Sequence, residues 1–434
     1  LHEPYRRQRQ MCIRDRQIIA IVIFLCTVSA IITGKIHNTV AAITGAVLLV
    51  LTRILTIEDC VEAVDVDTIC ILVGMMLTVA VIKNSGIFEY IAIKAAKLAK
   101  GRPWPIMVTF IIITALLSGM LDNVTTVLLV GPMTLAITNI LKVDPVPYII
   151  SQIMASNIGV TATLIGDPPN IMIGSAANLG FVDFILNTGF AIVFVVIAVL
   201  ICFYFIYGKK LFVTNEAIEK IMKLDEKKAI KNRRLMHESI IVVIIVAACF
   251  VFHDQLGVES ATIAIAAACV MLLIGKQDPE EIILSVEWPT ILFFIGLFIV
   301  VGGIKKVGII TMLANGLIAV TGGNVMLTML IILWVSAIVS SFLDNIPFVA
   351  TLIPLILSMQ SHGMDVTPIW WALSLGACLG GNGTLIGASA NVVLSGISKN
   401  NGHPITFGQY FKIGFPMMIL SIAVCTVFLL IRFA

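Results

Sequence analysis

Charged residues are scarce in this sequence. Only 12% of its 434 residues are Asp, Glu, Lys or Arg, whereas 59% are apolar. Soluble domains contain roughly 25% charged residues, so about half of the charge that a water-facing surface needs is missing. The apolar excess must face lipid, which predicts an all-α polytopic membrane protein.

The sequence also lacks the motifs of several functional classes. Its cysteines are scattered singly, with no C-x-x-C and no Cys/His pair at metal-ligand spacing, which argues against a zinc site. No H-E-x-x-H motif or Ser/His/Asp set is visible, so a membrane enzyme is not expected. The Lys and Arg residues lie between apolar runs, and we expect no nucleic-acid partner and no cofactor beyond a coupling ion.

The first 16 residues differ from the rest of the chain. They do not begin with Met, are basic and poor in apolar residues, and lack the apolar core and cleavage site of a signal peptide. We expect residues 1–16 to be a non-native tail, or an upstream helix to be missing.

Apolar runs define the expected membrane spans. A spanning helix needs about 20 apolar residues. Continuous apolar runs occupy residues 17–34, 38–56, 68–83, 188–208, 238–253, 259–275, 289–304 and 411–432. Four further apolar stretches are interrupted by polar residues, Gly or Pro, at residues 104–141, 147–178, 326–358 and 368–396.

The sequence contains an internal repeat. Asp122-Asn123 recurs 222 residues later as Asp344-Asn345. Matches at this offset are Thr68/Thr290, Gly74/Gly296, Lys83/Lys305, Gly86/Gly308 and Pro132/Pro354, followed at offset 221 by Pro147/Pro368, Thr163/Thr384, Gly166/Gly387 and Asn170/Asn391. We therefore predict a first repeat at 17–208, a linker at 209–237 and a second repeat at 238–434.

The order of the spans predicts that the repeats are inverted. Each half has three helices, one split hairpin, one broken helix and a final helix. If the hairpin is re-entrant, each half crosses about five times, and an odd number inverts the second copy. The linker holds nine Lys/Arg and should be cytoplasmic, with residues 84–102 on the same side and the acidic residues 57–67 outside.

The Asp-Asn pairs are the first candidate site. A carboxylate at membrane depth costs about 2.5–3.5 kcal/mol, so Asp122 and Asp344 are costly unless they face a polar cavity. At a hairpin tip, carboxylates and free backbone carbonyls can hold a cation, and helix N-termini an anion. We predict ion or substrate contacts from Thr125 and both pairs, with sodium at Asn123, Asn345 and neighbouring carbonyls. The alternative is that Asp and Asn only cap a helix.

The broken helices are the second candidate site. Gly and Pro interrupt a helix and leave backbone groups free, and paired interrupted segments indicate a transporter's binding site. The predicted contacts are Asn157, Thr163, Gly166, Asp167 and Asn170 in the first half, and Asn382, Gly383, Thr384, Ser389 and Asn391 in the second. A kink packed by small residues is the alternative. Asp167 is matched by Ala388, which predicts half-sites of different charge.

These motifs resemble those of the ion transporter superfamily. Residues 121–126 (LDNVTT) and 343–347 (LDNIP) look like its hairpins, and the run from Ser156 to Asn170 is similar to the branch of arsenite permeases, NhaD-type sodium/proton antiporters and the P protein. The resemblance implies a scaffold domain, a transport domain that moves like an elevator, and a homodimer. Related dicarboxylate/sodium symporters carry Ser-Asn-Thr at the tips, where Asp replaces Ser here.

The expected function is therefore secondary active ion transport, coupled to sodium or protons, in a bacterial plasma membrane. The substrate is a small inorganic ion or an organic anion, and the other partner is the lipid bilayer. The alternatives are sodium-coupled uptake of di- or tricarboxylates or another anion, and arsenite efflux. An ion channel lined by the midplane breaks is a further alternative.

Overall fold

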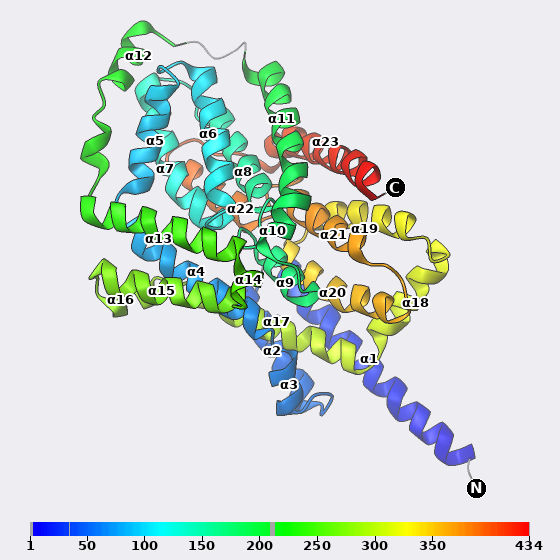
Figure 1. The fold of residues 1–434 in the computed structure, drawn as a ribbon. Coiled ribbons are helices and arrows are strands. Elements are labelled where there is room, and N and C mark those ends of the chain that lie inside the picture. The colour runs from blue at the N-terminus through cyan, green and yellow to red at the C-terminus, as the bar shows by residue number, and fades with distance from the viewer. Residues whose placement is uncertain (1–2, 34, 209–212, 434) are drawn as a thin grey trace.

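The computed structural model describes residues 3–33, 35–208 and 213–433, and the regular elements in these ranges are helices (Figure 1). Six of the described helices are long and apolar enough to cross a membrane, or up to seven if the bent pair α18–α19 is one span. The predicted all-α membrane fold is thereby confirmed. The first residues of the predicted tail and the first four of the linker, 209–212 with Lys209 and Lys210, lie outside the described residues.

The helices of the two halves begin at matching positions. The first half comprises α1 (Glu3–Thr33), α2 (Asn38–Leu51), α3 (Ile57–Ala63), α4 (Val66–Lys83), α5 (Ile87–Leu98), α6 (Pro103–Ser118), α7 (Asn123–Leu141), α8 (Val146–Val160), α9 (Pro168–Ala177), α10 (Phe181–Phe184) and α11 (Phe190–Phe203). After α12 (Asn215–Met222) come α13 (Arg233–Val251), α14 (His253–Leu256), α15 (Ser260–Gly275), α16 (Pro279–Leu284), α17 (Trp288–Lys306), α18 (Ile309–Thr321), α19 (Val325–Ser340), α20 (Asn345–Ser361), α21 (Thr367–Gly380), α22 (Ser389–Asn400) and α23 (Phe407–Phe433). The starts of α2 and α15, of α4 and α17, and of α7 and α20 are each 222 residues apart.

The two halves interlock through reciprocal helix pairs. In Figure 1, α2 packs against α17 and α15 against α4, so each half pairs with the other. A Cβ on Gly74 would lie 2.5 Å from the Ala264 backbone, and one on Gly296 would lie 2.8 Å from the Ala42 backbone. Both contacts obey the same sequence offset. Small residues thus allow close backbone approach at both crossings.

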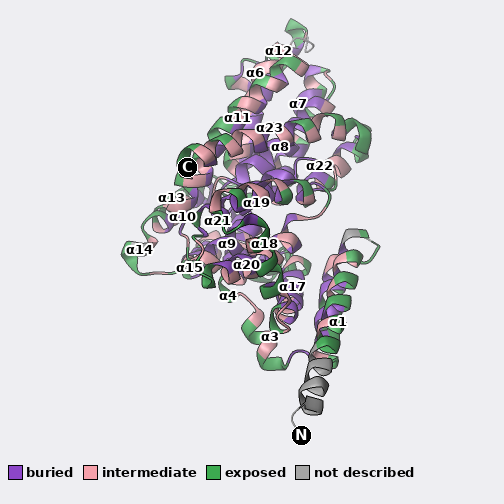
Figure 2. Cartoon of the chain, turned by 90° about the vertical axis from the view of Figure 1, so that its right-hand side faces the viewer, coloured by how far each residue is buried: buried purple, intermediate pink, exposed green. Residues whose placement is uncertain are grey.

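A further contact occurs once within each half, between α6 and α8 and between α19 and α21. A Cβ on Gly380 would lie 2.6 Å from the Ala337 carbonyl oxygen, and one on Gly159 would overlap the Ala115 carbonyl. The side chains of α8 and α21 are buried almost without exception, so these helices form the centre of the bundle (Figure 2).

Replacing Gly159 by Ala is expected to destabilise the protein by about 1–3 kcal/mol, because α6 and α8 must separate to admit the methyl group. The control is Gly316→Ala, since a Cβ there meets no described heavy atom within 4 Å. Thermal unfolding in detergent compares the two variants. Equal melting temperatures would mean that the α6–α8 contact is not tight.

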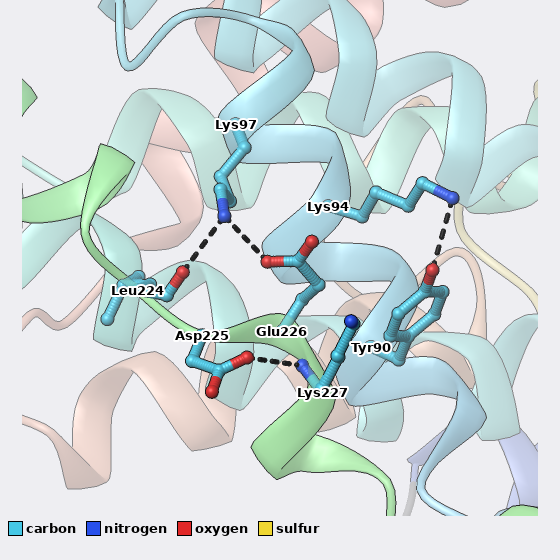
Figure 3. Close-up of polar contacts among 7 residues, drawn as sticks. All are labelled: Tyr90, Lys94, Lys97, Leu224, Asp225, Glu226 and Lys227. Atoms are coloured by element: carbon cyan, nitrogen blue, oxygen red, sulfur yellow. Dashed lines mark hydrogen bonds and ion pairs between the residues drawn. The ribbon is translucent and has the colours of Figure 1, made fainter.

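Several short helices were not predicted from the sequence. They include α3, α5, α16 and α18, which connect or flank the longer helices. The linker docks on α5, where the Lys97 ammonium donates to Glu226 at 2.6 Å and to the Leu224 carbonyl at 3.0 Å (Figure 3). This ammonium lowers the pKa of the Glu226 carboxyl. The linker and α5 therefore lie on one side of the molecule.

Candidate functional site

The two Asp-Asn pairs meet at one cavity. This central cavity, of about 320 Å³, is lined by Asp122 and Asn123 from the first half and by Asp344 and Asn345 from the second. Asp167, at the break between α8 and α9, lines it as well. The Asn345 amide donates to the Asp167 carboxylate at 3.0 Å, so the polar groups of the two halves are in direct contact.

Both tip aspartates cap the helix that follows them. The Asp122 carboxylate accepts from the Thr125 backbone N–H at 2.7 Å, and that of Asp344 from the Ile346 N–H at 3.4 Å. Capping orders the carboxylates at the positive ends of α7 and α20. Both side chains are half-buried and line the cavity, so capping and exposure to the cavity coexist.

Asparagines close the backbone breaks in both halves. The Asn170 amide donates to the carbonyls of Val160 at 3.1 Å and Thr163 at 2.9 Å. The Asn391 amide donates in the same way to Gly381 at 2.7 Å and to Thr384 at 2.9 Å. Carbonyls released by the helix breaks are thereby satisfied inside the protein, as burial demands.

Asn157 joins these elements into one buried network. Its amide donates to the side-chain oxygens of Asn382 at 3.0 Å and Asn391 at 2.8 Å. Its own oxygen accepts from Asn123 at 3.4 Å. The network links the α7 tip, which lines the central cavity, to the breaks of both halves.

The predicted site residues fall into two groups. Those that line the central cavity are Asp122, Asn123, Thr125, Asp167, Asp344, Asn345 and Ser389. Those that lie outside its lining are Asn157, Thr163, Gly166, Asn170, Asn382, Gly383, Thr384 and Asn391. The hydroxyls of Thr163 and Thr384 donate to the carbonyls of Gly119 and Ser341, so this group ties the breaks to the tips.

Three charged residues of the cavity were not predicted as site residues. Lys83 reaches it from the end of α4, Glu281 from α16, and Glu287 from the start of α17. The match of Lys83 with Lys305 in the repeat was the available signal. The cavity thus combines several carboxylates and amide oxygens with one ammonium group. Oxygen ligands suit hard cations, although the described residues contain no cluster of three His, Cys, Asp or Glu close enough to hold a metal.

The sequence is similar to that of known transporters. A family model described as citrate transporter (CitMHS) matches residues 28–376. An uncharacterized transporter of Mycobacterium tuberculosis is 40% identical over 96% of this chain and 98% of its own length. The human P protein is 32% identical over 95% of this chain, which spans 59% of that protein. The predicted resemblance to the P protein branch is confirmed.

The fold is similar to that of a solved transporter. The crystal structure of the YdaH transporter of Alcanivorax borkumensis aligns with a TM-score of 0.55 over 83% of this chain and 84% of that one, at 15% identity. The relatives are transporters rather than enzymes, and the bacterial ones agree with the predicted plasma membrane location. The chain belongs to the citrate transporter (CitMHS) family of multi-pass membrane transporters.

Proposed function

We propose that the protein is a secondary active transporter that couples sodium or protons to its substrate at the central cavity. The observation that carries this proposal is the convergence of Asp122, Asp167 and Asp344, from both halves, on one cavity. Carboxylates at membrane depth are costly and are retained where they bind or relay ions. The Asn123 and Asn345 amides, with neighbouring carbonyls, supply neutral oxygen ligands for sodium.

The proposed architecture is a pair of inverted repeats. The pairs α6–α7 and α19–α20 are re-entrant hairpins, and α8–α9 and α21–α22 are broken helices. The matching helix starts and the reciprocal helix pairs support this arrangement. The basic linker is cytoplasmic with α5 beside it, the hairpins and broken helices form a moving transport domain, and the protein is a homodimer.

Uptake of an organic anion is the second candidate. Lys83 supports it, because an ammonium group at the cavity can pair with a substrate carboxylate. The description of the family as citrate transporters points the same way. Under this proposal, the aspartates hold the coupling cation while Lys83 faces the anion.

Flux into proteoliposomes distinguishes these functions. The panel is sodium, citrate, succinate, arsenite and chloride, each with and without a pH gradient. We expect one substrate to show saturable flux that depends on a sodium or proton gradient. Flux that neither saturates nor couples to a gradient would instead identify a channel, and the absence of flux of any ion would contradict the proposal.

A further inference from the structure

Part of the lining of a second cavity is related by the sequence repeat to part of the lining of the central cavity. This α3 cavity, of about 460 Å³, lies where α3, α9, α17 and α20 meet. Its lining includes Asp59, Ala63, Asp65, Val301 and Lys305. The counterparts of these residues in the other repeat are Glu281, Ser285, Glu287, Val79 and Lys83, all of which line the central cavity. The same set of wall residues therefore occurs twice. It lies once at the start of α4 and the end of α17, and once at the end of α4 and the start of α17.

The opposite wall differs between the two cavities. The first hairpin faces the central cavity from Leu121, at its tip, into α7, whereas α20 of the second hairpin faces the α3 cavity from Ala350 onward. Ala350 is the repeat counterpart of Leu128, seven residues beyond Leu121. At 1.5 Å per residue, α20 is displaced by about 10 Å relative to α7. Consequently the Asp344 tip opens onto the central cavity and lies about two helical turns away from the α3 cavity.

At the α3 cavity, one side-chain hydrogen bond joins α9 to the start of α4. The Asp65 carboxylate, which caps α4, accepts from the Ser175 hydroxyl of α9 at 3.0 Å. The repeat counterpart of Asp65 is Glu287, which retains a carboxylate. The counterpart of Ser175 is Gly396, which has no side chain to donate. The Asp65–Ser175 hydrogen bond therefore has no counterpart between Glu287 and Gly396.

We propose that the α3 cavity is the second entrance to the transport site, and that the Asp65–Ser175 hydrogen bond keeps it closed in the state seen here. In the other state, the hairpins and broken helices shift by about 10 Å along α4 and α17. The tip aspartates then face Lys305 and Asp65 as they now face Lys83 and Glu287. This inference rests on the proposed transport function.

Labelling of repeat-related cysteines tests the inference. Ser285→Cys reports the central cavity and Ala63→Cys the α3 cavity, and thiol labelling of the full chain is measured from both sides of the membrane. Ser175→Ala should raise the ratio of Ala63→Cys to Ser285→Cys labelling by about tenfold, since a hydrogen bond to a charged group contributes about that factor. The matched control is Ser421→Ala, whose hydroxyl bonds only within α23, to the Met417 carbonyl.

A second variant keeps the inference testable if Ser175→Ala fails to fold. A Cβ on Gly396 meets no described heavy atom within 4 Å, so Gly396→Ser should fold. Its hydroxyl can pair with Glu287 in the other state, and should shift labelling in the same direction as Ser175→Ala. Unchanged ratios in both variants would overturn the inference. Because labelling needs no flux, shifted ratios without any transport would contradict the proposed function alone.

Discussion

Replacing Asp122 by Asn should abolish transport while leaving the protein folded. Asn caps helices as well as Asp does, so α7 keeps its cap while the charge disappears. Without this carboxylate a bound cation loses a charged partner, which costs on the order of 2–5 kcal/mol of binding free energy and predicts a loss of about two orders of magnitude or more in flux. The same result is expected for Asp344→Asn, whose side chain caps α20.

Asp365→Asn is the matched control for both variants. Asp365 accepts from the Thr367 N–H at 3.0 Å at the start of α21, and it is outside the central cavity. This variant should transport at the parent rate. Flux in proteoliposomes and size-exclusion profiles in detergent give the comparison. Full transport by both tip variants would remove the aspartates from the mechanism and leave them as helix caps.

The tip aspartates were predictable because their cost in lipid and their repetition are both properties of the sequence. A carboxylate within an apolar run stands out, and the repeat register marks it twice. The long helices were predictable for a similar reason, since a span must be apolar over its whole length. By contrast, α5 and α18 are short and amphipathic, so a search for continuous apolar runs passes over them.

The remainder of the site depended on three-dimensional packing. Lys83 and Glu287 stand at helix ends, where a sequence resembles an ordinary loop, and only the crossing of α4 with the second half brings them together. The roles of the Asn170 and Asn391 amides could not be predicted for a different reason. A side-chain amide can bind either a ligand or a backbone carbonyl at a helix break, and residue type and spacing are the same for both roles. In the structure both amides bind carbonyls at the breaks.

Replacing Asn157 by Ala should destabilise the protein by about 4 kcal/mol. The change leaves the buried side-chain oxygens of Asn382 and Asn391 without this donor, and each unsatisfied buried group costs about 1–3 kcal/mol. The melting temperature in detergent should therefore fall by roughly 10 °C, at about 2–4 °C per kcal/mol for a large domain. Asn401→Ala is the control, because that exposed amide bonds only to the Ile397 carbonyl of its own turn.

The same variant separates two roles for Asn157. If it joins the two halves, Asn157→Ala lowers the melting temperature and flux together, and the loss persists at saturating substrate because less folded protein remains. If it binds the ion, melting stays within a degree or two of the parent while the apparent affinity for the ion falls. The first outcome is expected, because the hydrogen bonds of Asn157 connect Asn123, Asn382 and Asn391 and it lies outside the cavity lining.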